Sequence, residues 1–182
     1  MEITLINGNP ESSNILFEER ISTFIEFLSK EHQVNCFILR DLEIKSCTGC
    51  FNCWVQNPGE CIFDDDRKKI REAAINSDIL LFTSPVIMGF TSALLKHAQD
   101  KLIPLLLPYI EFVNKECHHQ KRYENYPNLG LLYQNMDDTS TGDVEIMHQI
   151  YQRFAINFRA ELVLFENIEK NPEEIIHALN IN

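Results

Sequence analysis

The amino-acid sequence predicts an α/β domain in which a doubly wound, five-stranded parallel sheet of strand order 2-1-3-4-5 carries helices on both faces. Segments with strand character alternate with segments of helical periodicity along the chain, which favours parallel strands joined by crossover helices. The expected strands at residues 78–83 and 129–133 are apolar on both faces, as in a sheet buried on both sides. No linker or internal repeat interrupts the chain. We therefore expect residues 1–182 to form a single domain.

The first half of the chain is expected to contain two strands and two helices. Residues 3–6 form an apolar strand that ends at the turn sequence NGNP. Ser and Asn at 12–14 can cap a helix over residues 15–29, whose apolar residues recur at helical spacing. A second strand follows at 34–39. The acidic residues 64–66 can then cap a helix over 67–76, with carboxylates at its positive end.

The second half is expected to contain three strands and three helices. The strand at 78–83 leads into Ser84 and Pro85, and Thr91 and Ser92 can cap a helix that ends near Pro104 or Pro108. Residues 114–128 are polar and show no period, which predicts an irregular connection. The remaining elements are a strand at 129–133, a helix at 143–158, a strand at 161–165 and a helix at 172–179, with Pro172 in its first turn.

Composition and charge exclude several classes of partner. The 182 residues are 45% hydrophobic and 24% charged, which is typical of a globular protein. The net charge of −11 makes a nucleic-acid partner or an anionic membrane surface unexpected, because both bind clustered Lys and Arg. We find neither a basic segment leading into an apolar secretion signal nor an apolar run long enough to span a bilayer. Six cysteines without such a signal indicate a reducing compartment, so a cytoplasmic location is expected.

A cysteine-rich loop at residues 47–63 carries the densest chemistry in the chain. Cys47, Cys50 and Cys53 are spaced as C-x2-C-x2-C, and Cys61 follows a Pro-Gly turn. Four thiolates, three of them closely spaced, suit an iron–sulfur cluster, whereas the usual zinc site has two well-separated Cys pairs. The gap before Cys61 is longer than in the commonest cluster motif. A thiol-lined loop without metal and a structural zinc loop therefore both remain open.

Ligands of open parallel sheets bind at the carboxyl ends of the strands, near the point where the strand order reverses. Three loops leave the sheet there, at residues 7–14, 84–92 and 134–143. The first leads into a helix N-terminus, which suits a phosphate group. Short side chains at residues 12–14 can add donors, or can only cap the helix. Glu11 and the lack of Lys or Arg in this loop count against a tight phosphate site.

The segment SPVIMGFTSALLKHAQDK, together with the cysteine run, resembles the NAD(P)H-dependent FMN reductases of flavodoxin-like fold, and especially their iron–sulfur flavoprotein branch. The residues that match the flavin-loop motif of this family are Ser84, Pro85, Val86, Gly89, Ser92, Ala93, Leu95, Lys96, Asp100 and Lys101. Gly8, Pro10 and Asn14 resemble the phosphate loop of the family, and Asp64 and Asp65 match its acidic pair. The chain departs from the family at Asn9 and Glu11, and in a third loop that lacks a glycine pair.

The resemblance implies FMN and NAD(P)H as cofactors, with the flavin ring against residues 85–89 and the phosphate over residues 9–14. The expected cofactor-binding residues are Asn9, Pro10, Ser12, Ser13, Asn14, Ser84, Pro85, Val86, Ile87, Met88 and Gly89. A 4Fe–4S cluster would be held by Cys47, Cys50, Cys53 and Cys61. We expect these sulfurs close enough to the flavin to exchange electrons with it. No side chain is assigned a catalytic role, because the flavin performs the chemistry.

The function expected from these features is an FMN-dependent oxidoreductase that uses NAD(P)H and passes electrons, through the cluster, to a small-molecule or protein acceptor. The alternative is a flavodoxin-like redox- or metal-responsive binding module that has lost efficient FMN binding. The apolar residues 105–107, with Tyr109, Ile110 and Phe112, indicate a homodimer or a higher homo-oligomer. We expect His118 and His119 in a solvated loop. Phe51 and Trp54 either cover the flavin or the cluster, or pack within their own loop.

Overall fold

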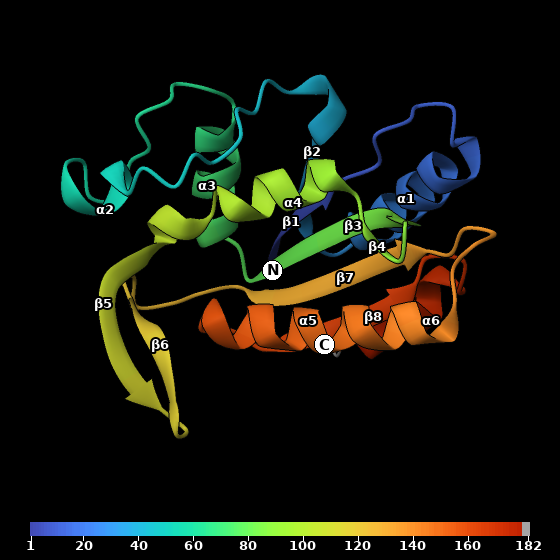
Figure 1. The fold of residues 1–182 in the computed structure, drawn as a ribbon. Helices are drawn as coiled ribbons and strands as arrows, with labels where there is room; N and C mark the ends of the chain where they lie inside the picture. Colours follow the sequence, from blue (N-terminus) through green and yellow to red (C-terminus); the bar gives the residue numbers. More distant parts are fainter. Residues whose placement is uncertain (180–182) are drawn as a thin grey trace.

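The computed structural model describes residues 1–179 as a central parallel sheet with helices on both faces (Figure 1). The order of its main strands is β2-β1-β3-β7-β8, and all four neighbouring pairs are parallel. In sequence order these strands are β1 (Glu2–Asn7), β2 (Gln33–Ile38), β3 (Ile79–Ile87), β7 (Asn128–Gln134) and β8 (Leu162–Asn167). This is the predicted order 2-1-3-4-5, so the predicted fold class is confirmed.

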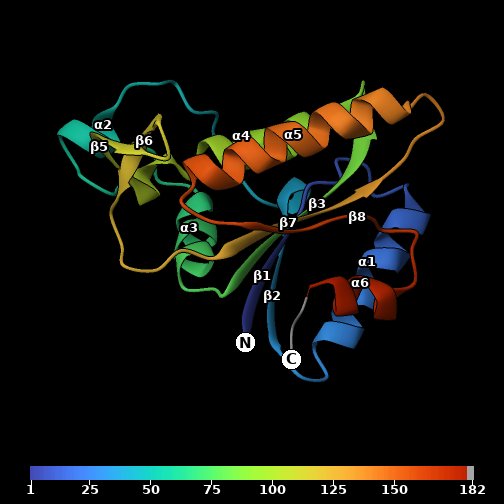
Figure 2. The same ribbon diagram turned by 90° about the horizontal axis from the view of Figure 1, so that it is seen from below.

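Two helical layers cover the sheet, as the view from below in Figure 2 shows. On one face lie α1 (Ile15–Leu28) and α6 (Pro172–Ala178), which pack against each other. On the other face lie α3 (Arg67–Ile75), α4 (Ala93–Asp100) and α5 (Thr141–Asn157). No helix within residues 1–179 is both long and apolar enough to cross a bilayer.

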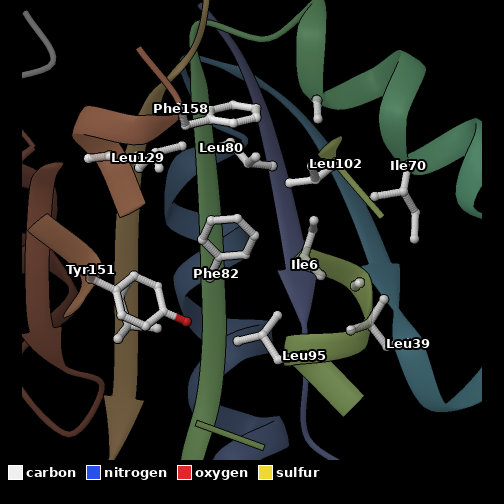
Figure 3. Packing of buried hydrophobic residues seen from close by; sticks show 14 of the residues in the cluster. Ile6, Leu39, Ile70, Leu80, Phe82, Leu95, Leu102, Leu129, Tyr151 and Phe158 are labelled. Carbon is white, nitrogen blue, oxygen red and sulfur yellow. The ribbon is translucent and has the colours of Figure 1, made fainter. Parts of the chain in front are cut away.

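The central strand β3 supplies side chains to both layers because successive residues of a strand point to opposite faces. Leu80 and Phe82 pack toward α3, α4 and α5, and Leu81 packs toward α1. The Phe82 ring lies beside that of Tyr151 (Figure 3), with 6.2 Å between the ring centroids. The centroid of the Phe154 ring lies 5.8 Å from that of Phe82. The larger core therefore lies between β3 and α5.

The caps expected for α1 and α4 are present, whereas Asp66 at the start of α3 makes no side-chain cap hydrogen bond. There Asp65 Oδ1 accepts from the Arg67 amide at 3.2 Å instead. The Asn14 side chain accepts a hydrogen bond from the Phe17 amide at the start of α1, and Ser92 accepts one from the Leu95 amide at the start of α4. Ser140 and Asp143 form a reciprocal capping box at the start of α5. These side chains accept hydrogen bonds from amides that have no partner within the helix.

The structure extends β3 beyond its predicted end at residue 83. Ser84 and Pro85 lie within the strand, which then turns back and pairs with β4 (Phe90–Thr91). Met88 and Gly89 form the two-residue turn with φ of 51° and 77°, and a two-residue hairpin turn of type I′ requires positive φ at both positions. The turn could not be predicted from the sequence, because Met is uncommon at positions of positive φ.

The predicted irregular connection over residues 114–128 is wrong in its first part. The chain forms an antiparallel hairpin of β5 (Leu106–Val113) and β6 (Glu116–Lys121), which lies beside the main sheet at its amino-terminal end (Figure 1). Asn114 and Lys115 form the turn, with φ of 50° and 69°. The sequence lacks the glycine that usually marks such a turn. The remaining elements are three short helices, η1 (Leu39–Asp41), α2 (Asn52–Val55) and η2 (Ile103–Leu105).

Replacing Phe82 with alanine should destabilise the protein by about 3–5 kcal/mol, because the substitution leaves a cavity in the larger core. Chemical denaturation of the purified variant measures the loss. Ile146→Ala is the matched control: Ile146 lies on α5 and is 57% exposed, so its truncation should change the free energy of unfolding by less than about 1 kcal/mol. Equal losses in the two variants would contradict the described core.

Candidate functional site

A cavity of about 530 Å³ opens at the carboxyl ends of β1, β3 and β7. The three predicted loops all contribute to it. Its lining residues are Asn9, Pro10, Glu11, Ser13, Asn14, Pro85, Val86, Ile87, Met88, Met136 and Asp138. Most of the cofactor-binding residues expected from the sequence are therefore brought together here. Ser12, Ser84 and Gly89 are not among the lining residues.

The first loop is held in shape by its own side chains. Asn9 is 1% exposed, and its Nδ2 donates hydrogen bonds to Glu18 Oε1 at 2.6 Å and to the Glu11 carbonyl at 2.8 Å. Arg40, in η1 after β2, donates to the same carboxylate oxygen at 2.8 Å. Asn9 therefore orders the loop. Glu18 and Arg40 were missed from the sequence because they come from α1 and from η1, outside the loop itself.

Gly8 brings the first loop against α4. Its amide donates to the Thr83 carbonyl at 2.8 Å, and its carbonyl accepts from the Ser92 hydroxyl. A Cβ atom at Gly8 would lie 2.6 Å from Leu95 Cβ, a distance that real Cβ contacts do not show. Only glycine allows this approach without a backbone shift.

Ser84 and Gly89 support the second loop from behind the cavity. The buried Ser84 hydroxyl donates to the Pro85 carbonyl at 2.7 Å and accepts from the Ser92 amide at 2.9 Å. Gly89 provides the positive φ of the turn, and a Cβ there would lie 2.8 Å from Asp143 Oδ1. The resemblance placed Gly89 among the cofactor-binding residues, but its lack of a side chain is required by the turn and by Asp143. Ser12 is exposed on the first loop.

The third loop closes the far side of the cavity. Gln134 is buried at the end of β7, and its Oε1 accepts a hydrogen bond from Asn14 Nδ2 at 2.7 Å. This contact ties the exit of β7 to the start of α1. Met136 and Asp138 line the cavity and were not among the predicted residues, although the sequence placed their loop beside it.

The residues of this cavity fit FMN. Its volume lies within the range of cofactor pockets, and the start of α1 offers amide groups and the positive end of a helix to a phosphate. Pro85, Val86 and Ile87 provide an apolar wall for a flat ring. Glu11 is exposed, so its carboxylate can remain in water while the phosphate contacts the loop.

The four cysteines of the predicted cluster line a second, smaller cavity of about 60 Å³. Cys53 is buried, Cys61 is partly buried, and Cys47 and Cys50 are exposed. Burial, and to a lesser extent Cys61, raises the pKa of the Cys53 thiol. The Asn52 amide is the main cause that lowers the pKa of Cys50.

The donor set is of the kind that an iron–sulfur cluster requires. A cube-shaped cluster takes each thiolate on a separate iron, and four cysteines line this cavity. No three His, Cys, Asp or Glu side chains of residues 1–179 are placed to hold one metal ion. Cys36 and Cys117 lie on β2 and β6, outside the lining of this cavity.

Aromatic contacts anchor the cysteine loop to the β5–β6 hairpin. Trp54 Nε1 donates to the Leu106 carbonyl at 2.9 Å, and the Trp54 ring lies 5.5 Å from the Phe51 ring and 4.8 Å from the His119 ring. Phe51 and Trp54 therefore pack within their loop and against the hairpin. Both also line the cysteine cavity, and neither lines the larger cavity.

The prediction that His118 and His119 lie in a solvated loop is wrong. His118 is 3% exposed, and its ring nitrogens lie 2.9 Å from Asn157 Oδ1 and 3.2 Å from Glu116 Oε2. This contact ties β6 to the end of α5. His119 packs on Trp54, so both rings are part of a folded hairpin.

The two cavities lie at opposite ends of the sheet, which corrects the expectation that the sulfurs of a chain lie beside its flavin. Both ribbon views place α2, in the cysteine loop, at one end and the β3–β4 turn at the other (Figures 1 and 2). Helix α4 links them. Ser92 at its start bonds Gly8 of the first loop, whereas Lys101 after its end lines the cysteine cavity. The eight residues of α4 alone span about 12 Å.

Comparison with known proteins identifies relatives that are named iron-sulfur flavoproteins. The chain is 29% identical over 106 residues to an iron-sulfur flavoprotein of Archaeoglobus fulgidus, covering 56% of this chain and 48% of that protein. It is 31% identical over 120 residues to iron-sulfur flavoprotein MJ1083 of Methanocaldococcus jannaschii, covering 60% and 55%. The chain thus spans about half the length of these relatives.

Solved structures share the fold. A putative quinone reductase from Klebsiella pneumoniae superposes with a TM-score of 0.67 at 14% identity, over 98% of this chain and 82% of that one. RosB superposes with a TM-score of 0.64 at 13% identity, over 93% and 66%. At such identities the likeness concerns the fold alone. The family profile described as NADPH-dependent FMN reductase matches residues 1–120, which contain both the first loop and the cysteine run, and the chain belongs to this family.

Proposed function

We propose that this protein is an FMN-dependent oxidoreductase that accepts a hydride from NAD(P)H. The observation that carries the proposal is the convergence of the first loop and the Pro85–Met88 segment on one cavity. These segments leave adjacent strands β1 and β3, beside the point where the strand order reverses, and family membership supports an oxidoreductase.

In this proposal the protein binds and orients the flavin, which supplies the hydride and single-electron chemistry. The start of α1 holds the phosphate, and the hydrogen bonds of Asn9, Glu18 and Arg40 keep the loop in shape before the cofactor arrives. Ile87 is 40% exposed and Met88 is 91% exposed. Both offer apolar surface at the mouth, where a flat ring would exclude water.

We further propose that the cysteine cavity holds a 4Fe–4S cluster that relays electrons to a small-molecule or protein acceptor. The cavity offers four cysteines in one compact loop, and the relatives from Archaeoglobus fulgidus and Methanocaldococcus jannaschii are named iron-sulfur flavoproteins. Because the two cavities of one chain lie at opposite ends of the sheet, we propose that electrons pass between copies of the chain.

The β5–β6 hairpin supports a homodimer. Leu105 and Leu106 are buried in the protein's own core, whereas Tyr109, Ile110 and Phe112 are between 54% and 73% exposed. The predicted apolar stretch is thus divided between the core and the surface. Apolar side chains on a hairpin that also anchors the cysteine loop would bring a second copy close to the proposed cluster.

Ser13→Glu should weaken FMN binding at least tenfold, because the new carboxylate would face the phosphate at the start of α1. Titration of flavin fluorescence measures the dissociation constant. An acid at this position interacts favourably with the helix dipole, so the variant is expected to fold, and its circular dichroism spectrum should match that of the wild type. Riboflavin, which lacks the phosphate, should bind the variant and the wild type equally well.

Thr23→Glu adds the same charge on the exposed side of α1 and should leave FMN binding unchanged. A wild-type protein that ignores FMN would contradict the proposed oxidoreductase and favour a binding module without flavin. Equal weakening of FMN and riboflavin by Ser13→Glu would show that the phosphate lies elsewhere.

Replacement of Cys50 or Cys61 with serine should abolish cluster binding, because each thiolate holds one iron of the cluster. Iron and acid-labile sulfide are measured after anaerobic reconstitution. Cys117→Ser, on the exposed hairpin strand, should keep the wild-type content. Bound zinc without sulfide, or equal iron content in all three variants, would contradict the cluster.

Phe112→Glu should convert the proposed dimer to a monomer, because Phe112 is 73% exposed on β5 and a carboxylate would be buried between copies. Sedimentation velocity measures the mass. A wild-type protein that is monomeric at micromolar concentration would contradict the dimer, as would an unchanged mass in the variant.

A further inference from the structure

Lys101 is a buried cation whose polar partner is a cysteine. The residue is 3% exposed, although lysine is rarely buried unless it is paired. Its ammonium Nζ lies 3.9 Å from Cys61 Sγ, and Lys101 forms no ion pair with a carboxylate of residues 1–179. A buried ammonium without an anion is costly. Its surroundings therefore suit an anionic group on the sulfurs.

The backbone fixes this ammonium in the cysteine cavity. Lys101 follows α4, and its amide donates to the Ala98 carbonyl at 3.1 Å. The side chain passes over the Phe63 ring, with Nζ 4.9 Å from the ring centroid, a contact that favours the cation. Lys101 lines this cavity together with all four cysteines.

Two neighbouring lysines lack these properties. Lys96, on the same helix, is about half exposed and pairs with Asp100. Lys45 has its Nζ 5.9 Å from the Phe63 ring centroid and is exposed. Water screens both charges. Lys101 differs from them in being buried against sulfur.

We propose that Lys101 is the counter-charge of the cysteine cavity, a positioning residue that stabilises the reduced state of the cysteine-bound cluster. This inference rests on the cluster proposed above. Reduction adds one electron and one negative charge to the cluster, without making or breaking a bond. A fixed cation beside a ligand sulfur stabilises the more negative state more strongly, because the interaction scales with charge in a medium of low dielectric constant. The resemblance had placed Lys101 at the end of a flavin-loop motif, but its contacts are with the cysteine loop.

The test is an anaerobic redox titration with dithionite as the electron donor, performed on the reconstituted full chain. Lys101→Met retains the length and apolar stem of the side chain but removes the charge. It should lower the midpoint potential of the cluster, with at least a tenfold fall in the equilibrium constant of reduction, which is about 59 mV for one electron. Lys101→Arg should stay close to the wild type. Lys45→Met and Lys96→Met should not change the potential.

The outcomes separate this inference from the proposed function. A wild-type chain that takes up no iron and sulfide overturns both. A loaded Lys101→Met variant with the wild-type potential overturns only the role of Lys101, as does an equal shift in Lys101→Met and Lys45→Met. If Lys101→Met fails to hold the cluster, retention by Lys101→Arg supports the counter-charge, and loss in both variants overturns it.

Discussion

The hydrogen-bonded contact between Gly8 and the start of α4 is the constraint on which the rest of the structure depends. The Gly8 amide binds the Thr83 carbonyl, and its carbonyl binds the Ser92 hydroxyl. Ser92 in turn binds Ser84 and caps α4. One small group of residues thus fixes the exits of β1 and β3 and the direction of α4. A side chain at Gly8 would separate these parts.

The same contact connects the two candidate sites. At one end of α4, the cap residue holds the first and second loops around the larger cavity. At the other end, Lys101 enters the cysteine cavity. The position of α4 therefore affects both the larger cavity and the cysteine cavity, although no residue lines both. Each site must then be completed by its own neighbours: Gln134, at the end of β7, for the larger cavity, and the β5–β6 hairpin for the cysteine cavity.

Local patterns were sufficient to predict the main sheet. Apolar strands and capped helices alternate regularly along the chain, and a parallel doubly wound sheet permits few arrangements of five such units. The loops at the carboxyl ends of β1 and β3 could also be assigned, because topology brings these ends together whatever their sequences. Residues such as Asn14 and Pro85 were identified on that basis.

Features that depend on contacts between distant segments could not be predicted. The sequence did not indicate that Ser84 faces Ser92, that Asp143 occupies the space beside Gly89, or that Arg40 reaches the first loop. The hairpin was missed because Asn114 and Lys115 supply its turn without glycine. The cysteines were placed beside the flavin by analogy with motif order, whereas the length of α4 separates the two sites.

The most direct test of FMN binding in the larger cavity is to map where FMN contacts the protein. Amide signals in nuclear magnetic resonance spectra can be followed while FMN is added to the metal-free chain. We expect the largest shifts of amide signals at residues 9–14, 85–88 and 136–138, with little shift at residues 47–61. Changes centred on the cysteine loop, or no change at all at saturating FMN, would contradict this expectation.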